Sequence, residues 1–168
     1  MSFQRLHIFG GAGSGKTTLA EAYAQAHDIP HHELDNVYYT EPSARQKRER
    51  TERDALYGQI VSEDCWVLDG IFWQPWVTPS LARADKILVL AVPQTTRHYR
   101  VFMRHLKLLS QASPSEYPRF FPTLIELLKH NRIYDSGPLQ ETLALVSAFS
   151  DKVAVCQSNA EAEALLEI

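Results

Sequence analysis

The chain has 168 residues, 45% of them hydrophobic and 22% charged, so it is long enough and apolar enough to form one globular domain. Its formal net charge of −3 argues against a broad cationic surface of the kind that binds nucleic acid or anionic membranes. No apolar run reaches the length of a bilayer span, and the N-terminal residues lack the pattern of a secretion signal. We expect a single cytoplasmic domain over residues 1–168, with Cys65 and Cys156 reduced in its core.

The first predicted strand, residues 4–9, leads into a glycine-rich loop that fits the pattern G-x-x-x-x-G-K-[ST]. Glycines permit backbone angles that turn successive N–H groups toward a phosphate. Lys16 supplies a positive charge for the β- and γ-phosphates, and the Thr17 hydroxyl is the expected Mg²⁺ ligand. A helix predicted to run to His27 points its positive end at the same phosphates. The expected nucleotide-binding residues are Gly10, Gly11, Ala12, Gly13, Ser14, Gly15, Lys16, Thr17 and Thr18.

Strands and helices are predicted to alternate along the rest of the chain. A weak strand at residues 31–34 ends at Asp35, residues 36–40 form an aromatic loop, and a charged helix runs from Pro42 to about Ser62. The later expected elements are a strand at 65–68, an irregular segment at 71–80, a strand at 86–92, helices at 95–109, 119–134 and 138–149, a strand at 152–156 and a helix at 159–168. This alternation predicts an α/β domain with a parallel sheet, whose ligands lie at the carboxyl ends of the strands.

Asp69 follows a compact apolar strand and is the best candidate for a second Mg²⁺ ligand. The next residue is Gly70, where ATPases that activate water commonly carry a glutamate, so the sequence favours transfer to an acceptor over hydrolysis. The alternative is that Asp69 only forms a turn at the end of the strand.

A cationic stripe marks the helix at residues 95–109. Arg97, Arg100, Arg104 and Lys107 are spaced to lie near one face, and His98, Val101, Phe102, Leu106 and Leu109 occupy the opposite side. Such a helix followed by a Ser- and Pro-containing loop suits a lid that closes over polyphosphate, with Arg100 and Arg104 as its catalytic residues. The alternative is a solvated face without a catalytic role.

Candidates for an acceptor site are fewer and more ambiguous. Asp35 is either a base that binds an acceptor hydroxyl or a turn residue. Four rings could line an acceptor pocket or belong to the core, namely Tyr38, Tyr39, Trp73 and Trp76, and the position of Trp73 next to Asp69-Gly70 favours it for the pocket. His31 and His32 are interpreted as strand residues, because no cluster of metal-binding side chains accompanies them. The charged run 45–53 favours a solvated helix face over a phosphate- or nucleic-acid-binding surface.

Taken together, these motifs resemble the adenylate-kinase-like phosphate-loop kinases, and within them the small DNA topology modulation, or FlaR-type, proteins. The resemblance covers roughly residues 5–110. The matching segments are Gly13-Ser14-Gly15-Lys16-Thr17, Leu34-Asp35 with Tyr38, Trp66-Val67-Leu68-Asp69-Gly70, Leu88-Val89-Leu90 and the arginines from 97 to 104.

The resemblance implies a three-layer fold with a five-stranded parallel sheet in the order 2-3-1-4-5, and ATP with Mg²⁺ as cofactors. It implies an acceptor-binding helical region near residues 36–63, a short helical lid near 108–119, and adenine held by Arg104 and Asn159. Asp35, Tyr38, Gly70 and Trp73 are the expected acceptor-binding residues. In true adenylate kinases the Asp-Gly pair continues as Phe-Pro-Arg, and the arginine contacts phosphate. This chain continues Ile71-Phe72-Trp73 instead, and the missing arginine does not favour AMP as the acceptor.

The sequence thus predicts a phosphotransferase that moves the γ-phosphoryl group of Mg-ATP to a nucleotide or a small hydroxylated acceptor. The alternative is a nucleic-acid-associated nucleotide-binding protein or NTPase without a small acceptor, against which the acidic net charge weighs. No membrane partner is expected, and the chain is expected to be a monomer or a homodimer.

Overall fold

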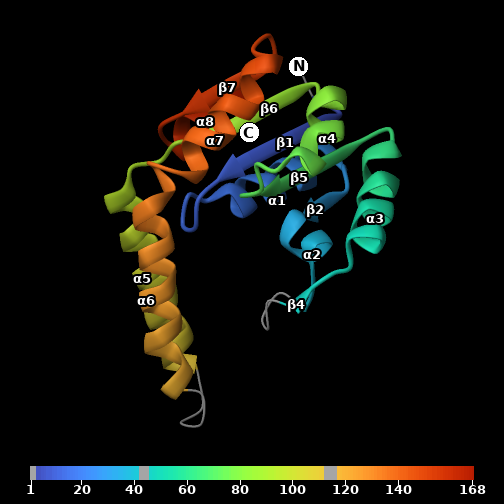
Figure 1. Cartoon of the computed structure of the whole chain (residues 1–168). Helices are drawn as coiled ribbons and strands as arrows, with labels where there is room; N and C mark the ends of the chain where they lie inside the picture. Colours follow the sequence, from blue (N-terminus) through green and yellow to red (C-terminus); the bar gives the residue numbers. More distant parts are fainter. Residues whose placement is uncertain (1–2, 42–45, 112–116) are drawn as a thin grey trace.

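The computed structural model describes residues 3–41, 46–111 and 117–168, apart from the side chains of residues 117–121 (Figure 1). At its centre is a five-stranded sheet in the order β2-β5-β1-β6-β7, with every neighbouring pair parallel. The strands are β1 (Arg5–Gly10), β2 (His31–Glu33), β5 (Trp66–Gly70), β6 (Lys86–Leu90) and β7 (Val153–Cys156). Numbered within this sheet alone, the order is 2-3-1-4-5, so the predicted α/β fold and strand order are confirmed.

Helices cover both faces of the sheet because the central strands are apolar on both sides. Leu6 and Ile8 of β1 point to one face, which α1 (Lys16–His27) and α8 (Asn159–Leu166) cover. Phe9 points to the other face, against α3 (Arg50–Ser62), α4 (Thr78–Arg83) and α7 (Pro138–Val146). The result is a three-layer domain that holds the ends of β1, β2 and β5 side by side (Figure 1).

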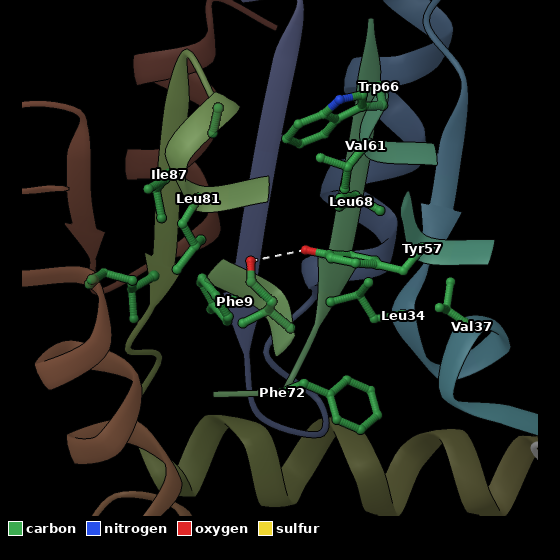
Figure 2. Packing of buried hydrophobic residues seen from close by; sticks show 14 of the residues in the cluster. Phe9, Leu34, Val37, Tyr57, Val61, Trp66, Leu68, Phe72, Leu81 and Ile87 are labelled. Carbon is green, nitrogen blue, oxygen red and sulfur yellow. Dashed lines mark hydrogen bonds between the residues drawn. The ribbon is translucent and has the colours of Figure 1, made fainter. Parts of the chain in front are cut away.

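Figure 2 shows the larger of the two cores, in which Phe9 and Leu34 lie between the sheet and the helices. The hydroxyl of Tyr57 crosses this core and donates a hydrogen bond to the carbonyl oxygen of Val77 at 2.9 Å. A buried tyrosine needs such a partner, because its hydroxyl would otherwise be desolvated without compensation. This bond ties α3 to the segment that precedes α4.

The segment after β2 differs from the predicted aromatic loop and long helix. A short helix, α2 (Leu34–Tyr38), replaces the start of the loop, because one turn places Leu34 and Val37 together in the core. An antiparallel ribbon of β3 (Tyr39–Glu41) and β4 (Gln46–Lys47) follows, and α3 begins only at Arg50. Pro42, the predicted start of that helix, lies outside the described residues. The segment expected to be irregular at 71–80 contains a 3₁₀ turn and the start of α4.

Two 18-residue helices, α5 (Gln94–Gln111) and α6 (Tyr117–Tyr134), pack against each other and extend away from the sheet (Figure 1). The predicted lid region, 108–119, is at their far end, and residues 112–116 of it lie outside the described part of the chain. None of the helices within the described ranges combines the length and the apolar character that a bilayer crossing requires.

The face on which α5 is buried contradicts the sequence interpretation. Of the residues assigned to the apolar side, Val101 is buried but Phe102 and Leu106 are 45% and 43% exposed, whereas Arg97 of the cationic stripe is fully buried. The physical reason is that α5 contacts the domain only along the side that faces α6 and the phosphate loop. The guanidinium is stabilised there by its hydrogen bonds, so burial of a charge is tolerated.

Candidate active site

The glycine-rich loop joins β1 to α1 at the carboxyl edge of the sheet. Gly13 and Gly15 adopt φ angles of 78° and 87°, a left-handed conformation that favours glycine. Space restricts both positions as well, because a Cβ on Gly13 would lie 2.6 Å from the carbonyl oxygen of Arg97, and one on Gly15 would lie 2.5 Å from Nδ2 of Asn159. The loop therefore takes the conformation expected of an anion-binding nest, with α1 starting directly behind it.

Asp69 lies near the end of β5, where it contacts two residues of the phosphate loop and α1. The Thr17 hydroxyl donates a hydrogen bond to Oδ2 of Asp69 at 2.8 Å, and Nζ of Lys16 is 3.9 Å from the same oxygen. The Asp69 side chain is 1% exposed, so its charge is held by these neighbours. The structure thus brings together Lys16, Thr17 and Asp69, as the sequence predicted.

His31 is a member of this group that sequence reasoning missed. It lies in β2, as predicted, but its Nε2 is 2.7 Å from Oδ1 of Asp69. Burial opposes protonation of His31, but the hydrogen bond to Asp69 and the charges of Asp69, Glu33 and Glu21 outweigh it, so the pKa of His31 is raised. The predicted strand order already placed β2 beside β5, but not their register, in which His31 lies opposite Val67, two residues before Asp69, so no signal in the sequence identified this contact.

The donor set at this point fits magnesium. A hydroxyl from Thr17 and a carboxylate from Asp69 are hard oxygen ligands of the kind that Mg²⁺ prefers, and Mg²⁺ completes its shell with water and phosphate oxygens. Across the described residues, no group of three or more His, Cys, Asp and Glu side chains could hold a metal ion by itself. The arrangement therefore suits an ion that arrives with nucleotide phosphates.

Helices α5 and α6 hold the phosphate loop from the other side. The Asn131 amide donates a hydrogen bond to the carbonyl oxygen of Ala12 at 3.1 Å, and Nε of Arg97 donates to Oδ1 of Asn131 at 2.8 Å. The ring of Tyr134 lies against Gly11, and the Arg97 guanidinium lies 4.7 Å from the centre of that ring. Arg97 therefore supports the loop from within the protein, and Asn131 and Tyr134 are further residues that the sequence did not single out.

The predicted lid arginines differ in their surroundings. Nη1 of Arg100 donates to Oδ1 of Asn159 at 2.6 Å and to the carbonyl oxygen of Ser14 at 3.1 Å. The structure thus brings Arg100 and Asn159 together beside the phosphate loop. Arg104 is exposed one turn further along α5, and none of the residues described forms a hydrogen bond or ion pair with it.

A cavity of about 520 Å³ opens next to the phosphate loop. Lys16, Asp35, Tyr38 and Trp73 line it, together with side chains of α6. Three of the four predicted acceptor-binding residues therefore share one cavity with the loop lysine. Gly70, the fourth, is not part of its lining: a Cβ there would lie 2.8 Å from Cβ of Leu34, so this glycine permits close packing of α2 on β5.

Aromatic residues in the wall of this cavity pack on one another and on Trp76 behind them. Tyr38 lies 4.7 Å from Phe72 between ring centres, and Phe72 lies 5.4 Å from Trp76. The Arg53 guanidinium lies 4.7 Å from the Trp76 ring, a distance typical of a cation–π contact. Trp76 is therefore a support for the wall of the cavity and not part of its surface.

The described arginines of the charged run bind groups of this chain. Arg48 donates to the carbonyl oxygen of Val37, and Arg53 donates to Asp54 at 2.6 Å. Arg50 is 3.7 Å from the same aspartate. Arg50, whose side chain is 86% exposed, fits the predicted solvated face, whereas Arg48 precedes α3 and Arg53 is largely buried; Arg45 lies outside the described residues.

Comparison with known proteins gives a distant relative and a fold. No family model matches the chain. Over 142 residues the chain is 23% identical to the uncharacterized protein YqaC of Bacillus subtilis (strain 168). The aligned region covers 82% of this chain and 76% of YqaC.

Among solved structures, shikimate kinase from Bacteroides thetaiotaomicron superposes with a TM-score of 0.55 at 15% identity, over 99% of this chain and 100% of that one. A gluconokinase from Sinorhizobium meliloti 1021 gives a TM-score of 0.47 at 18% identity, over 90% of this chain and 96% of that one. The sheet, the helices around it and the loop at its carboxyl edge therefore have the fold of a phosphate-loop kinase such as shikimate kinase.

Proposed function

We propose that this protein transfers the γ-phosphoryl group of Mg-ATP to a hydroxylated small molecule bound in the 520 Å³ cavity. The observation that carries the proposal is the shared lining: Gly10, Ala12 and Lys16 of the phosphate loop face the same cavity as Asp35. A donor phosphate held by the loop and an acceptor held by Asp35 would therefore meet in one cavity, which is the main requirement of phosphoryl transfer.

On the donor side, the loop amides and Lys16 bind the β- and γ-phosphates, and Thr17 and Asp69 hold Mg²⁺. Magnesium, when bound, neutralises charge on the phosphate oxygens. His31 holds the Asp69 carboxylate from its second oxygen, which supports a fixed orientation of that ligand. Asn159 and Arg104 bind adenine, and Arg100 and Arg104 stabilise the charge that develops during transfer. The contact between Arg100 and Asn159 beside the loop supports the first of these arginines.

On the acceptor side, Asp35 binds the hydroxyl and takes its proton. The hydroxyl oxygen forms a bond to the γ-phosphorus as the bond from that phosphorus to the bridging oxygen breaks, and ADP leaves. Tyr38 and Trp73 supply walls for the acceptor. Because Gly70 follows Asp69, the position lacks a carboxylate that could activate water, which supports transfer over hydrolysis.

More specifically, we propose an adenylate-kinase-like enzyme of the topology modulation type. It would work in the cytoplasm, as a monomer or homodimer, on a nucleotide or a small hydroxylated acceptor. A purely nucleic-acid-associated NTPase remains the competing function. Arg48 and Arg53 bind groups of this chain and so do not support a nucleic-acid surface. The experiment below distinguishes the two functions.

The experiment is a coupled ADP-release assay with Mg-ATP and a panel of nucleoside monophosphates, nucleosides and small hydroxylated metabolites. Wild type, Lys16→Ala and Asp35→Asn are compared. We expect acceptor-dependent ADP release that falls by at least about 100-fold in both variants, with ATP binding retained in Asp35→Asn. Slow ADP release that no acceptor changes and that DNA stimulates would contradict the proposal.

A further inference from the structure

If the proposed function holds, the residues that line the cavity indicate the chemical class of the acceptor. Five aromatic side chains line the cavity, from three separate parts of the chain: Tyr38, Tyr39, Phe72, Trp73 and Tyr134. A site for an aliphatic polyol would instead be expected to present mainly hydrogen-bonding groups, since each hydroxyl needs a partner when it is buried. The lining therefore favours a ligand with a flat, apolar face.

Most of these rings are already engaged within the protein. Tyr38 packs against Phe72 at 4.7 Å and Tyr39 at 4.9 Å. Tyr134 is 2% exposed, between Gly11 and the guanidinium of Arg97. These side chains form a fixed wall, because moving any of them would disturb a packed neighbour.

Trp73 is the exception. It lines the cavity and is only half-buried, and no ring or cation within the described parts of the chain packs on its indole. A large aromatic face that borders a cavity and has no partner of its own is suited to stacking with a ligand ring. Its position directly after the Asp69–Phe72 segment fixes it close to the end of β5.

A second observation concerns the next residue. Gln74 also lines the cavity, and its Oε1 is buried without a hydrogen-bond partner among the described residues. A buried amide oxygen without a partner is unfavourable, so a group that donates a hydrogen bond to it on ligand binding would be stabilising. If the Gln74 amide rotates so that Oε1 faces the cavity, a flat ring stacked on Trp73 and carrying an N–H or O–H at its edge meets both requirements at once.

We propose that the acceptor is a heteroaromatic alcohol: its planar ring stacks on Trp73, a donor at the ring edge binds Gln74, and its hydroxyl reaches Asp35 in the same cavity. The γ-phosphoryl group is transferred to the hydroxyl oxygen of this alcohol, and its ring is not changed by the reaction.

Isothermal titration calorimetry tests the ring requirement without any need for transfer. The probes are adenosine and cytidine, whose rings carry an amino donor, against ribose, gluconate and shikimate, in the presence of a non-hydrolysable ATP analogue. We expect at least one heteroaromatic probe to bind at least tenfold more tightly than every non-aromatic one. In Trp73→Leu this preference should fall below threefold, whereas Trp73→Phe, which keeps a ring, should retain most of it.

Gln74→Met keeps the length of the side chain but removes its hydrogen-bonding atoms. We expect this variant to bind the preferred heteroaromatic probe about fivefold to tenfold more weakly than wild type does, with no change in its affinity for ribose. The inference is overturned if a non-aromatic probe binds best, or if Trp73→Leu binds the heteroaromatic probe as wild type does. Thermal melts of each variant confirm that the protein remains folded.

The two proposals fail in different ways. Tight, Trp73-dependent binding of a heteroaromatic alcohol without ADP release would support the ring site and contradict the kinase function. ADP release with a non-aromatic polyol, lost in Asp35→Asn, would support the kinase function and contradict the ring site.

Discussion

The side-chain amide of Asn131 donates a hydrogen bond to the carbonyl oxygen of Ala12, 3.1 Å away, and so joins α6 to the centre of the phosphate loop. The same side chain accepts a hydrogen bond from the buried Arg97 of α5. Both helices of the projecting pair therefore act on the geometry of the loop, although neither belongs to the strand–loop–helix motif that identifies it.

The first prediction concerns this bond. Asn131→Asp keeps an oxygen for Arg97 but replaces the donor to Ala12 with a carboxylate, so we expect the loop to lose its support and ATP to bind at least about tenfold more weakly. The measurement is the dissociation constant of a fluorescent ATP analogue. Asp135→Asn is the control, because it alters a half-exposed partner of Arg97 and leaves the bond to Ala12 in place. ATP affinity equal to wild type in Asn131→Asp would contradict the assignment.

The second prediction concerns the hydroxyl of Thr17, which donates a hydrogen bond to Asp69. Thr17→Val preserves the shape of the side chain but removes the oxygen, and we expect ADP release to fall by about 100-fold or more. Thr17→Ser keeps the oxygen and should stay within about fivefold of wild type. ADP release is measured across a Mg²⁺ titration, and equal losses in the two variants would show that the hydroxyl has no special role.

The third prediction concerns stability and pH. His7 is fully buried, and its ring lies 2.8 Å from the Ser80 hydroxyl. Burial, only partly opposed by the charge of Asp69, lowers the pKa of His7 to about 3, whereas the unfolded chain protonates His7 near pH 6.5. Between those values the unfolded state binds the extra proton, so stability falls as the pH falls, by up to about 1.4 kcal/mol per pH unit.

Urea unfolding between pH 7 and pH 4 measures this effect. His7→Phe retains stacking on Phe9 and has no proton to bind, so its stability should depend less steeply on pH than that of wild type over this range. Parallel curves for the two proteins would show that His7 is not the group responsible.

The fourth prediction compares two glycines. In Gly70→Ala the new Cβ would meet Cβ of Leu34 at 2.8 Å, so α2 must shift and we expect a loss of about 1–3 kcal/mol. Gly58→Ala is the matched control: it is exposed inside α3 with nothing within 4 Å of the new atom, and should stabilise the protein by up to about 1 kcal/mol. Thermal melts give both values, and a neutral Gly70→Ala would contradict the packing role assigned to that position.

Most of the fold could be predicted from the sequence because its determinants are local. The apolar runs ending at Asp69 and Leu90 identify buried parallel strands, and the loop pattern indicates a helix behind it. Of the site, Thr17 and Asp69 could be predicted because each follows a strand whose end lies at the same sheet edge.

The parts that were missed depend on contacts between distant segments. Hydrophobic periodicity places apolar side chains inside, so it does not predict the burial of Arg97, which is stabilised by Asn131 of α6 and by Asp135 just after that helix. The bond from His31 to Asp69 depends on strand register, which no pattern within residues 31–34 encodes. Asn131 has no motif of its own, and its role becomes visible only once α6 lies beside the loop.

The most direct test of the central claim follows the label from [γ-³²P]ATP in a reaction with the preferred acceptor. The account predicts that wild type places the label on the small molecule, that Lys16→Ala places none, and that Asp35→Asn binds ATP but transfers at least about 100-fold more slowly. Label recovered only as inorganic phosphate, at the same rate with and without acceptor, would contradict it.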